Sequence, residues 1–109
     1  MHIGNLTVSP FDPATKFAGE IFSLVCSADI HPLPTHGELS MFEWFFGNSS
    51  RPSGATVSNV TKSGNTTYTS ILQFPALHKT YTGMYTCHIG YTAVSTTITV
   101  VGKDSLHFD

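Results

Sequence analysis

Four residues at particular spacings restrict the fold of this chain more than any other feature of its sequence. Two cysteines, Cys26 and Cys87, lie far apart, Trp44 lies between them, and Tyr85 stands two residues before the second cysteine. Apolar and polar residues alternate over residues 19–26, so Cys26 shares one face of that segment with two other apolar side chains. This period of two predicts a β-strand that leads into Cys26.

Similar short alternating runs fill most of the chain and predict an all-β fold. The expected strands cover residues 3–8, 20–28, 40–46, 55–61, 67–74, 83–89 and 94–101. The interval between Trp44 and Cys87 leaves room for only one or two strands ahead of residues 67–74. Turn-forming residues separate the runs, as in the hairpin signal at residues 62–65.

Three other connections have features of their own. We expect a turn at residues 11–14 and a corner, with one helical turn, over residues 75–79. Two prolines within residues 30–37 disfavour a helix and predict an extended loop there.

The strand segments resemble the core of the immunoglobulin superfamily. The matching segments are Gly19 to Cys26 for strand B, Phe42-Glu43-Trp44-Phe45 for strand C, Leu72-Gln73-Phe74 for strand E, and Leu77 to Cys87 for the E–F corner and strand F. The resemblance spans residues 3–101 and implies an immunoglobulin-like β-sandwich of two sheets, with an I-set or C2-like set of strands. The length of the chain predicts a single domain, over residues 1–102, and the polar, unpatterned residues 103–109 are expected to be a linker or an appended tail.

The resemblance also implies roles for the four residues. Cys26 and Cys87 form the disulfide that joins the two sheets, Trp44 packs against it, and Tyr85 hydrogen-bonds back across the corner. The chain departs from the family pattern at Tyr81, where an acidic residue usually pairs with a basic one. We therefore expect aromatic or apolar packing in place of that ion pair. The long interval between Cys26 and Trp44 adds an extended loop.

All four asparagines of the chain stand in the N-x-[ST] pattern of glycan acceptors. They are Asn5, Asn48, Asn59 and Asn65. With about a quarter of the residues Ser or Thr, chance produces four such matches at odds on the order of a third of a percent. The alternative explanation is that Asn favours turns and Thr favours strands. The pattern indicates an extracellular glycoprotein.

The acceptor pattern also bears on the cysteines, because disulfides form in the same oxidising compartment in which glycans are added. A disulfide that closes a loop of about 60 residues stabilises a domain by about 4 kcal/mol in the chain-entropy model. The alternative is two reduced, buried thiols, as in cytoskeletal immunoglobulin modules.

Charge and motifs argue against several classes of function. The net charge of -2 lacks the basic footprint of a nucleic-acid-binding protein. No nucleophile elbow, phosphate-binding loop or dinucleotide fingerprint is present, so we expect no enzyme activity and no cofactor. His31 and His36 lie five residues apart, but no cysteine or carboxylate completes a metal site. The sequence therefore favours non-catalytic binding.

The resemblance places strands C, F and G in one sheet, and its outward positions form the candidate interface. The residues concerned are Glu43, Phe45, Thr86 and His88, with Ser95, Thr97 and Thr99 beside them. Phe45 and His88 are expected to be neighbours and to form a small amphipathic patch of the kind that binds proteins. The alternative is that Phe45 is an ordinary exposed apolar residue.

The resemblance implies a module of a cell-surface adhesion molecule or receptor, including the receptor tyrosine kinase type. Its expected partner is a protein, either the same molecule or another ectodomain, with no nucleic acid. The sequence contains no run long enough to span a bilayer and no signal peptide at Met1. We expect an ectodomain fragment of a membrane-anchored parent, on the outer side of the plasma membrane. A spacer domain without its own ligand is the alternative, and a cytoskeletal module is a third.

Overall fold

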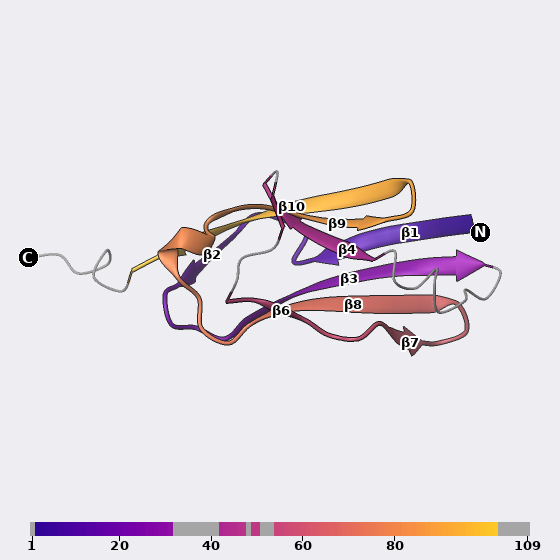
Figure 1. Cartoon of the computed structure of the whole chain (residues 1–109), viewed down its shortest axis with the longest axis horizontal. Helices are drawn as coiled ribbons and strands as arrows, with labels where there is room; N and C mark the ends of the chain where they lie inside the picture. The colour runs from indigo at the N-terminus through magenta and orange to yellow at the C-terminus, as the bar shows by residue number, and fades with distance from the viewer. Residues whose placement is uncertain (1, 32–41, 48, 51–53, 103–109) are drawn as a thin grey trace, which may run out of the picture.

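Two β-sheets pack face to face in the computed structural model (Figure 1), which describes residues 2–31, 42–47, 49–50 and 54–102. The first sheet, called the β3 sheet, contains β1 (His2–Ser9), β3 (Phe22–His31), β8 (Thr67–Phe74), β6 (Thr56–Val57) and β7 (Thr61–Ser63). The second, called the β9 sheet, has the order β2 (Ala14–Phe17), β10 (Thr92–Val101), β9 (Gly83–Ile89), β4 (Glu43–Phe46) and β5 (Ser49–Ser50). The expected all-β, two-sheet sandwich is confirmed.

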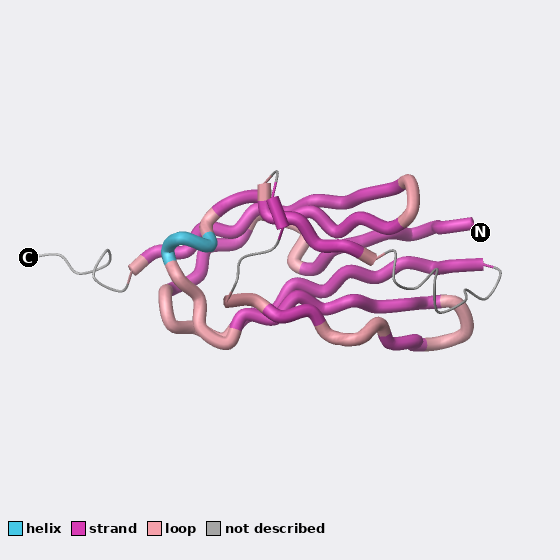
Figure 2. Tube along the Cα trace, in the orientation of Figure 1, coloured by secondary structure: helices cyan, strands magenta, loops and turns pink. Residues whose placement is uncertain are grey.

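The long strands follow the alternation of the sequence. The expected bounds of β8 and β9 are confirmed residue for residue. Strand β3 continues to His31, three residues beyond its expected end, and β10 begins two residues early at Thr92. A short 3-10 helix, η1, covers Lys79–Tyr81 rather than residues 75–79 and is the only helical segment drawn in Figure 2.

The first strand of the sandwich divides between the two sheets, which the sequence analysis did not predict. Strand β1 pairs antiparallel with β3, and β2 pairs in parallel with residues 98–101 of β10. The sequence predicted a turn at residues 11–14 and no strand between that turn and Gly19, so β2 was missed. Pro10 and Pro13 carry no N–H for a ladder, so the chain leaves the first sheet there. The Thr96 hydroxyl donates to the Phe11 carbonyl at 3.1 Å, which holds the crossing segment against β10.

Among the described residues between β4 and β8 there are three short strands, β5, β6 and β7, where one or two were expected. Residues 55–61 do not form one strand: β6 and β7 are separate, and each pairs with β8. Ser58 explains the interruption, because its Oγ accepts the Ile71 N–H at 3.2 Å and competes with the backbone ladder. The expected loop over residues 30–37 and the start of the expected strand over 40–46 lie largely outside the described residues.

The core lies between the sheets and is built from the inward side of each alternating run. Its largest fully buried side chains are Tyr85, Phe74, Leu24, Ile30, Leu72, Leu77, Ile89 and Ile98. The N–H of Leu77 donates to the Glu20 carbonyl and the N–H of Gly19 to the Leu77 carbonyl, both at 2.8 Å. This reciprocal pair joins the β2–β3 turn to the corner before η1.

Gly83 is required where β9 begins, because its backbone and its surroundings both exclude a larger residue. Its φ is +152°, and a Cβ built there would lie 2.8 Å from Cε1 of Phe46. The Phe46 ring has little room to yield, since it stacks on Tyr85 at a centroid distance of 4.7 Å.

We expect Gly83→Ala to lower the free energy of unfolding by roughly 1–3 kcal/mol, the usual cost of overpacking a close contact. Urea denaturation measures this change. Gly64→Ala is the matched control, because Gly64 also has a positive φ of +78° but no atom within 4 Å of the added carbon. Equal losses in the two variants would show that backbone conformation alone, and not the Phe46 contact, makes glycine necessary.

Candidate functional site

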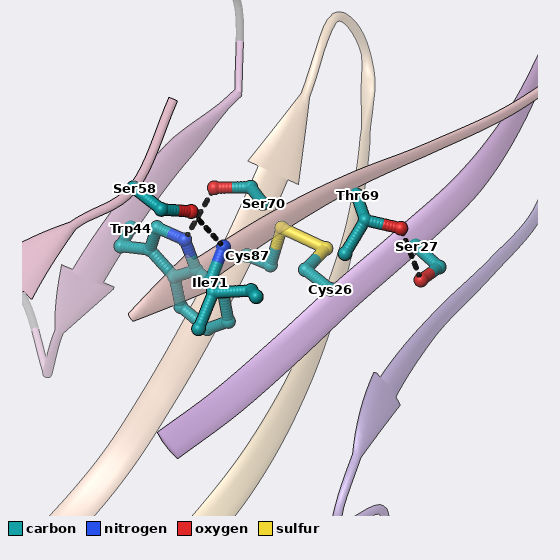
Figure 3. The surroundings of a disulfide bond; sticks show 8 residues. All are labelled: Cys26, Ser27, Trp44, Ser58, Thr69, Ser70, Ile71 and Cys87. Carbon is teal, nitrogen blue, oxygen red and sulfur yellow. Dashed lines mark hydrogen bonds between the residues drawn. A yellow bond between two sulfur atoms is a disulfide. The ribbon is translucent and has the colours of Figure 1, made fainter. Parts of the chain in front are cut away.

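The disulfide between Cys26 and Cys87 joins β3 of one sheet to β9 of the other. The S–S distance is 2.07 Å, the Cα atoms lie 6.3 Å apart, and both residues are fully buried. Trp44 is the cross-strand partner of Cys87 on β4, and Figure 3 shows its indole ring next to that cysteine. The bond thereby fixes the positions of β4 and β9, the two strands that carry the candidate interface.

A buried serine, which the sequence analysis missed, accepts the hydrogen bond of the Trp44 indole N–H. The Trp44 Nε1–H donates to Ser70 Oγ at 3.0 Å (Figure 3), and Ser70 is fully buried. Ser70 is also the cross-strand partner of Cys26. The signal was present in the sequence, because Ser70 is a polar residue at an inward position of an otherwise apolar alternation. A buried indole needs such an acceptor.

Replacing Ser70 with alanine leaves the Trp44 N–H buried without a partner, so Ser70→Ala should cost about 1–3 kcal/mol of stability. Guanidinium unfolding followed by fluorescence measures this directly, because the chain has a single tryptophan. Ser27→Ala serves as the control, since Ser27 bonds Thr69 on the outer, partly exposed side of the same sheet. A loss no greater than that of the control would contradict the role assigned to Ser70.

The Tyr85 hydroxyl closes the corner between β8 and β9. It donates to the Tyr81 carbonyl at 2.6 Å, and burial, with the neighbouring Tyr81, raises the pKa of Tyr85. The Tyr81 ring packs on Phe74 at a centroid distance of 5.5 Å, and its hydroxyl lies against Gly54. The expectation that aromatic packing occupies the place of the family's ion pair is confirmed.

The structure brings together the four residues of the candidate interface. On adjacent strands, Glu43 pairs with His88 and Phe45 pairs with Thr86. The rings of Phe45 and His88 meet edge to face at a centroid distance of 6.3 Å. We call the outward side of β4, β9 and β10 the CFG face. Its residues are Glu43, Phe45, Met84, Thr86, His88, Ala93, Ser95, Thr97 and Thr99.

Two further features complete the CFG face. Met84, which the sequence analysis did not include, is 49% exposed, and its alternation with Thr86 and His88 was the available signal. The hydroxyls of Thr86 and Ser95 are 2.8 Å apart and link β9 to β10. On these three strands Glu43 is the only outward residue with a formal charge. The face therefore combines apolar groups with hydroxyls and very little charge.

The three acceptor asparagines that the structure describes belong to the other sheet. Asn5 lies on β1, Asn59 lies between β6 and β7, and Asn65 lies in the turn between β7 and β8; all three are exposed. Asn48 lies outside the described residues. Glycan occupancy at all four remains a prediction.

Asn5 takes part in a polar cluster that spans three strands. Its Nδ2 donates to Asp29 Oδ2 at 2.7 Å, and the Thr67 hydroxyl donates to Asp29 Oδ1 at 2.8 Å. These two hydrogen bonds stabilise the charged carboxylate and lower the pKa of Asp29. The bond from Asn5 has the larger effect and the bond from Thr67 the smaller.

A folded-state pKa below the unfolded value gives stability that is present above about pH 4 and is lost as the pH falls through the folded pKa. We therefore expect the free energy of unfolding of the native chain to fall more steeply below about pH 4 than that of Asn5→Ala. Urea unfolding at a series of pH values measures the slope. Thr69→Ala leaves the cluster intact and should retain the native slope. Parallel curves for the native chain and Asn5→Ala would refute this assignment.

Within the described part of the chain, no three His, Cys, Asp or Glu side chains are grouped so that they could hold a metal ion. A separate finding concerns helices: over the same residues, none is long and apolar enough to cross a membrane.

Comparison with known proteins identifies the fold. No family model matches the sequence, and no curated protein matches it. Solved structures do match. Dpr2 Ig1-Ig2, crystallised in complex with DIP-Theta, is similar at a TM-score of 0.70 and 17% identity, over 93% of this chain and 50% of that one. The N-terminal eight Ig domains of Down Syndrome Cell Adhesion Molecule are similar at a TM-score of 0.69 and 19% identity, over 90% of this chain and 13% of that one.

An immunoglobulin-like domain of human Obscurin-like protein 1 is also similar, at a TM-score of 0.61 and 16% identity, over 91% of this chain and 88% of that one. At such identities the likeness defines the fold. The protein is an immunoglobulin-like β-sandwich domain. It spans half the length of the Dpr2 chain and a smaller part of the eight-domain chain.

Proposed function

We propose that this domain is an extracellular recognition module of a cell-surface adhesion molecule or receptor, and that it binds another protein through the CFG face. The partner is a second copy of the chain or another ectodomain. The observation that carries the proposal is the contrast between the two outer faces of the sandwich. The outer face of the β9 sheet has apolar groups and little charge, and the described glycan acceptors lie on the edge strand and connections of the β3 sheet.

The composition of the CFG face supports a protein partner. Met84 is 49% exposed and Phe45 is half-buried, so both offer apolar contact area, and His88 lies against Phe45. The hydroxyls of Ser95, Thr97 and Thr99 on β10 lie to one side of these apolar groups. Interfaces between proteins likewise combine apolar and aromatic anchors with polar groups and few charges.

The acceptor asparagines support the choice of face. Glycans on Asn59 and Asn65 would extend from the edge of the β3 sheet that β7 forms, and a glycan on Asn5 from its opposite edge at β1. A glycan is bulky and hydrated, and it blocks the surface beneath it. The described acceptors therefore leave the CFG face open to a partner.

The disulfide and the acceptor pattern together support the extracellular side of the plasma membrane, because both belong to an oxidising, secretory environment. Two of the similar structures are in keeping with this proposal. One is Dpr2 in complex with DIP-Theta, and the other is named as a cell adhesion molecule.

A spacer domain is the second candidate, and two exposed residues favour it. Ile21 is 83% exposed just before β3, and Tyr91 is 75% exposed in the β9–β10 turn. These two segments lie at opposite ends of the sandwich (Figure 1). Exposed apolar residues at both ends suit a domain whose contacts are with its neighbours in an array, as in solenoids and repeat chains.

Substituting Phe45 separates the two candidates. We expect Phe45→Arg to weaken binding at least tenfold, because it places a charge among the apolar groups of the face. The measurements are sedimentation for self-association and binding to a panel of ectodomains displayed on cells. Ile21→Arg is the matched control, with the same new side chain at an exposed apolar site away from the face.

Unchanged association in Phe45→Arg would exclude the CFG face as the interface. A loss confined to Ile21→Arg would favour the spacer. Circular dichroism of both variants verifies that each retains the sandwich.

A further inference from the structure

Among the described acceptor asparagines, Asn5 is the one whose backbone has an unusual conformation. Its φ is +51°, a left-handed value that few residues other than glycine adopt, although asparagine does so more often than most. The β1–β3 register shifts at this point, between the pairs Gly4–Asp29 and Thr7–Ser27. This shift in register is a β-bulge, and the Leu6 side chain within it packs against the core and holds it in place.

The side chain of Asn5 is held as well as its backbone. The amide nitrogen Nδ2, the atom to which an N-glycan is attached, lies 2.7 Å from Oδ2 of Asp29. Thr67 holds the other carboxylate oxygen at 2.8 Å, and it does so from β8, where it is the cross-strand partner of Asp29. The carboxylate is thus a fixed acceptor, supported by a neighbouring strand.

We propose that Asp29 is a positioning residue for an N-glycan on Asn5, and that it holds the glycosylated amide against β3. The inference rests on the proposed extracellular function, which supplies the glycosylation machinery. In the transfer, a bond forms between Nδ2 and C1 of N-acetylglucosamine, and the bond from C1 to the diphosphate of the lipid-linked donor breaks. Nδ2 gives up one of its two protons to water and keeps the other, which it donates to Asp29 after folding.

Such a contact restricts the orientation of the glycan on Asn5 more than that of glycans on Asn59 and Asn65. A glycan on Asn65 extends from the turn between β7 and β8, and one on Asn59 from the connection between β6 and β7. The glycan on Asn5 has its first linkage fixed by a charge-assisted hydrogen bond. Its core sugars therefore stay on the β3 side of the sandwich and leave the CFG face clear.

The test uses the domain secreted from mammalian cells and digested, while folded, with peptide-N-glycanase. Site-specific mass spectrometry follows the release of each glycan. We expect release at Asn5 to be about tenfold slower than at Asn65, because the enzyme must detach the amide from Asp29 and a hydrogen bond to a charged group is worth about that factor. Asp29→Ala should abolish the difference by accelerating Asn5 alone. Asp12→Ala, which removes an exposed carboxylate elsewhere, should change neither rate.

A second measurement avoids mutation, since Asp29→Ala also removes the Thr67 contact and loosens β1. In ¹⁵N-labelled glycoprotein, the remaining Nδ2–H resonance of Asn5 should shift as Asp29 is protonated, and that of Asn65 should not. Three results would overturn the inference. They are an Asn5 without a glycan, equal release rates at Asn5 and Asn65, and an Asn5 Nδ2–H resonance that does not shift as Asp29 is protonated. If Asn59 and Asn65 carry glycans and Asn5 is bare, the inference about Asp29 is overturned and the extracellular function is not affected. If all three asparagines are bare, the result counts against the extracellular function as well.

Discussion

The bond between Cys26 and Cys87 is the constraint on which the rest of this structure depends. It ties the middle of β3 to the middle of β9, and the removal of such a bond from a small domain typically costs about 2–5 kcal/mol. The indole of Trp44 covers it, and Ser70 takes up the one polar atom of that indole. A domain of this size has a small core, so this cluster contributes much of what holds the two sheets in a single arrangement.

Fixing the two sheets also separates their outer faces chemically. The outer side of the β3 sheet carries hydroxyls, the Asp29 cluster and the described acceptor asparagines. The CFG face carries Phe45, Met84 and His88 with a single charged side chain. Neither face contributes much to the core, so each is free to serve a purpose of its own. The two proposals assign glycan attachment to one face and protein recognition to the other.

Much of the fold and part of the candidate site could be predicted because the relevant signal is local. Strands β8 and β9 alternate without interruption, and their predicted bounds match those found, since a period of two shows in consecutive residues. The Phe45–His88 contact followed once Trp44 and Cys87 fixed which face points inward. Short strands were missed where a single side chain interferes, as Ser58 does with the ladder to β8.

The sequence by itself determined the all-β class, the inward side of each long strand and the four possible glycan acceptors, because these depend on neighbouring residues only. The tertiary structure alone decided that the first strand divides between two sheets, that Ser70 accepts from Trp44, and that Asn5 meets Asp29. Each of these contacts joins residues far apart in the chain. They exist only once the strands have paired in one register, since a shift by a single residue would turn every side chain to the opposite face.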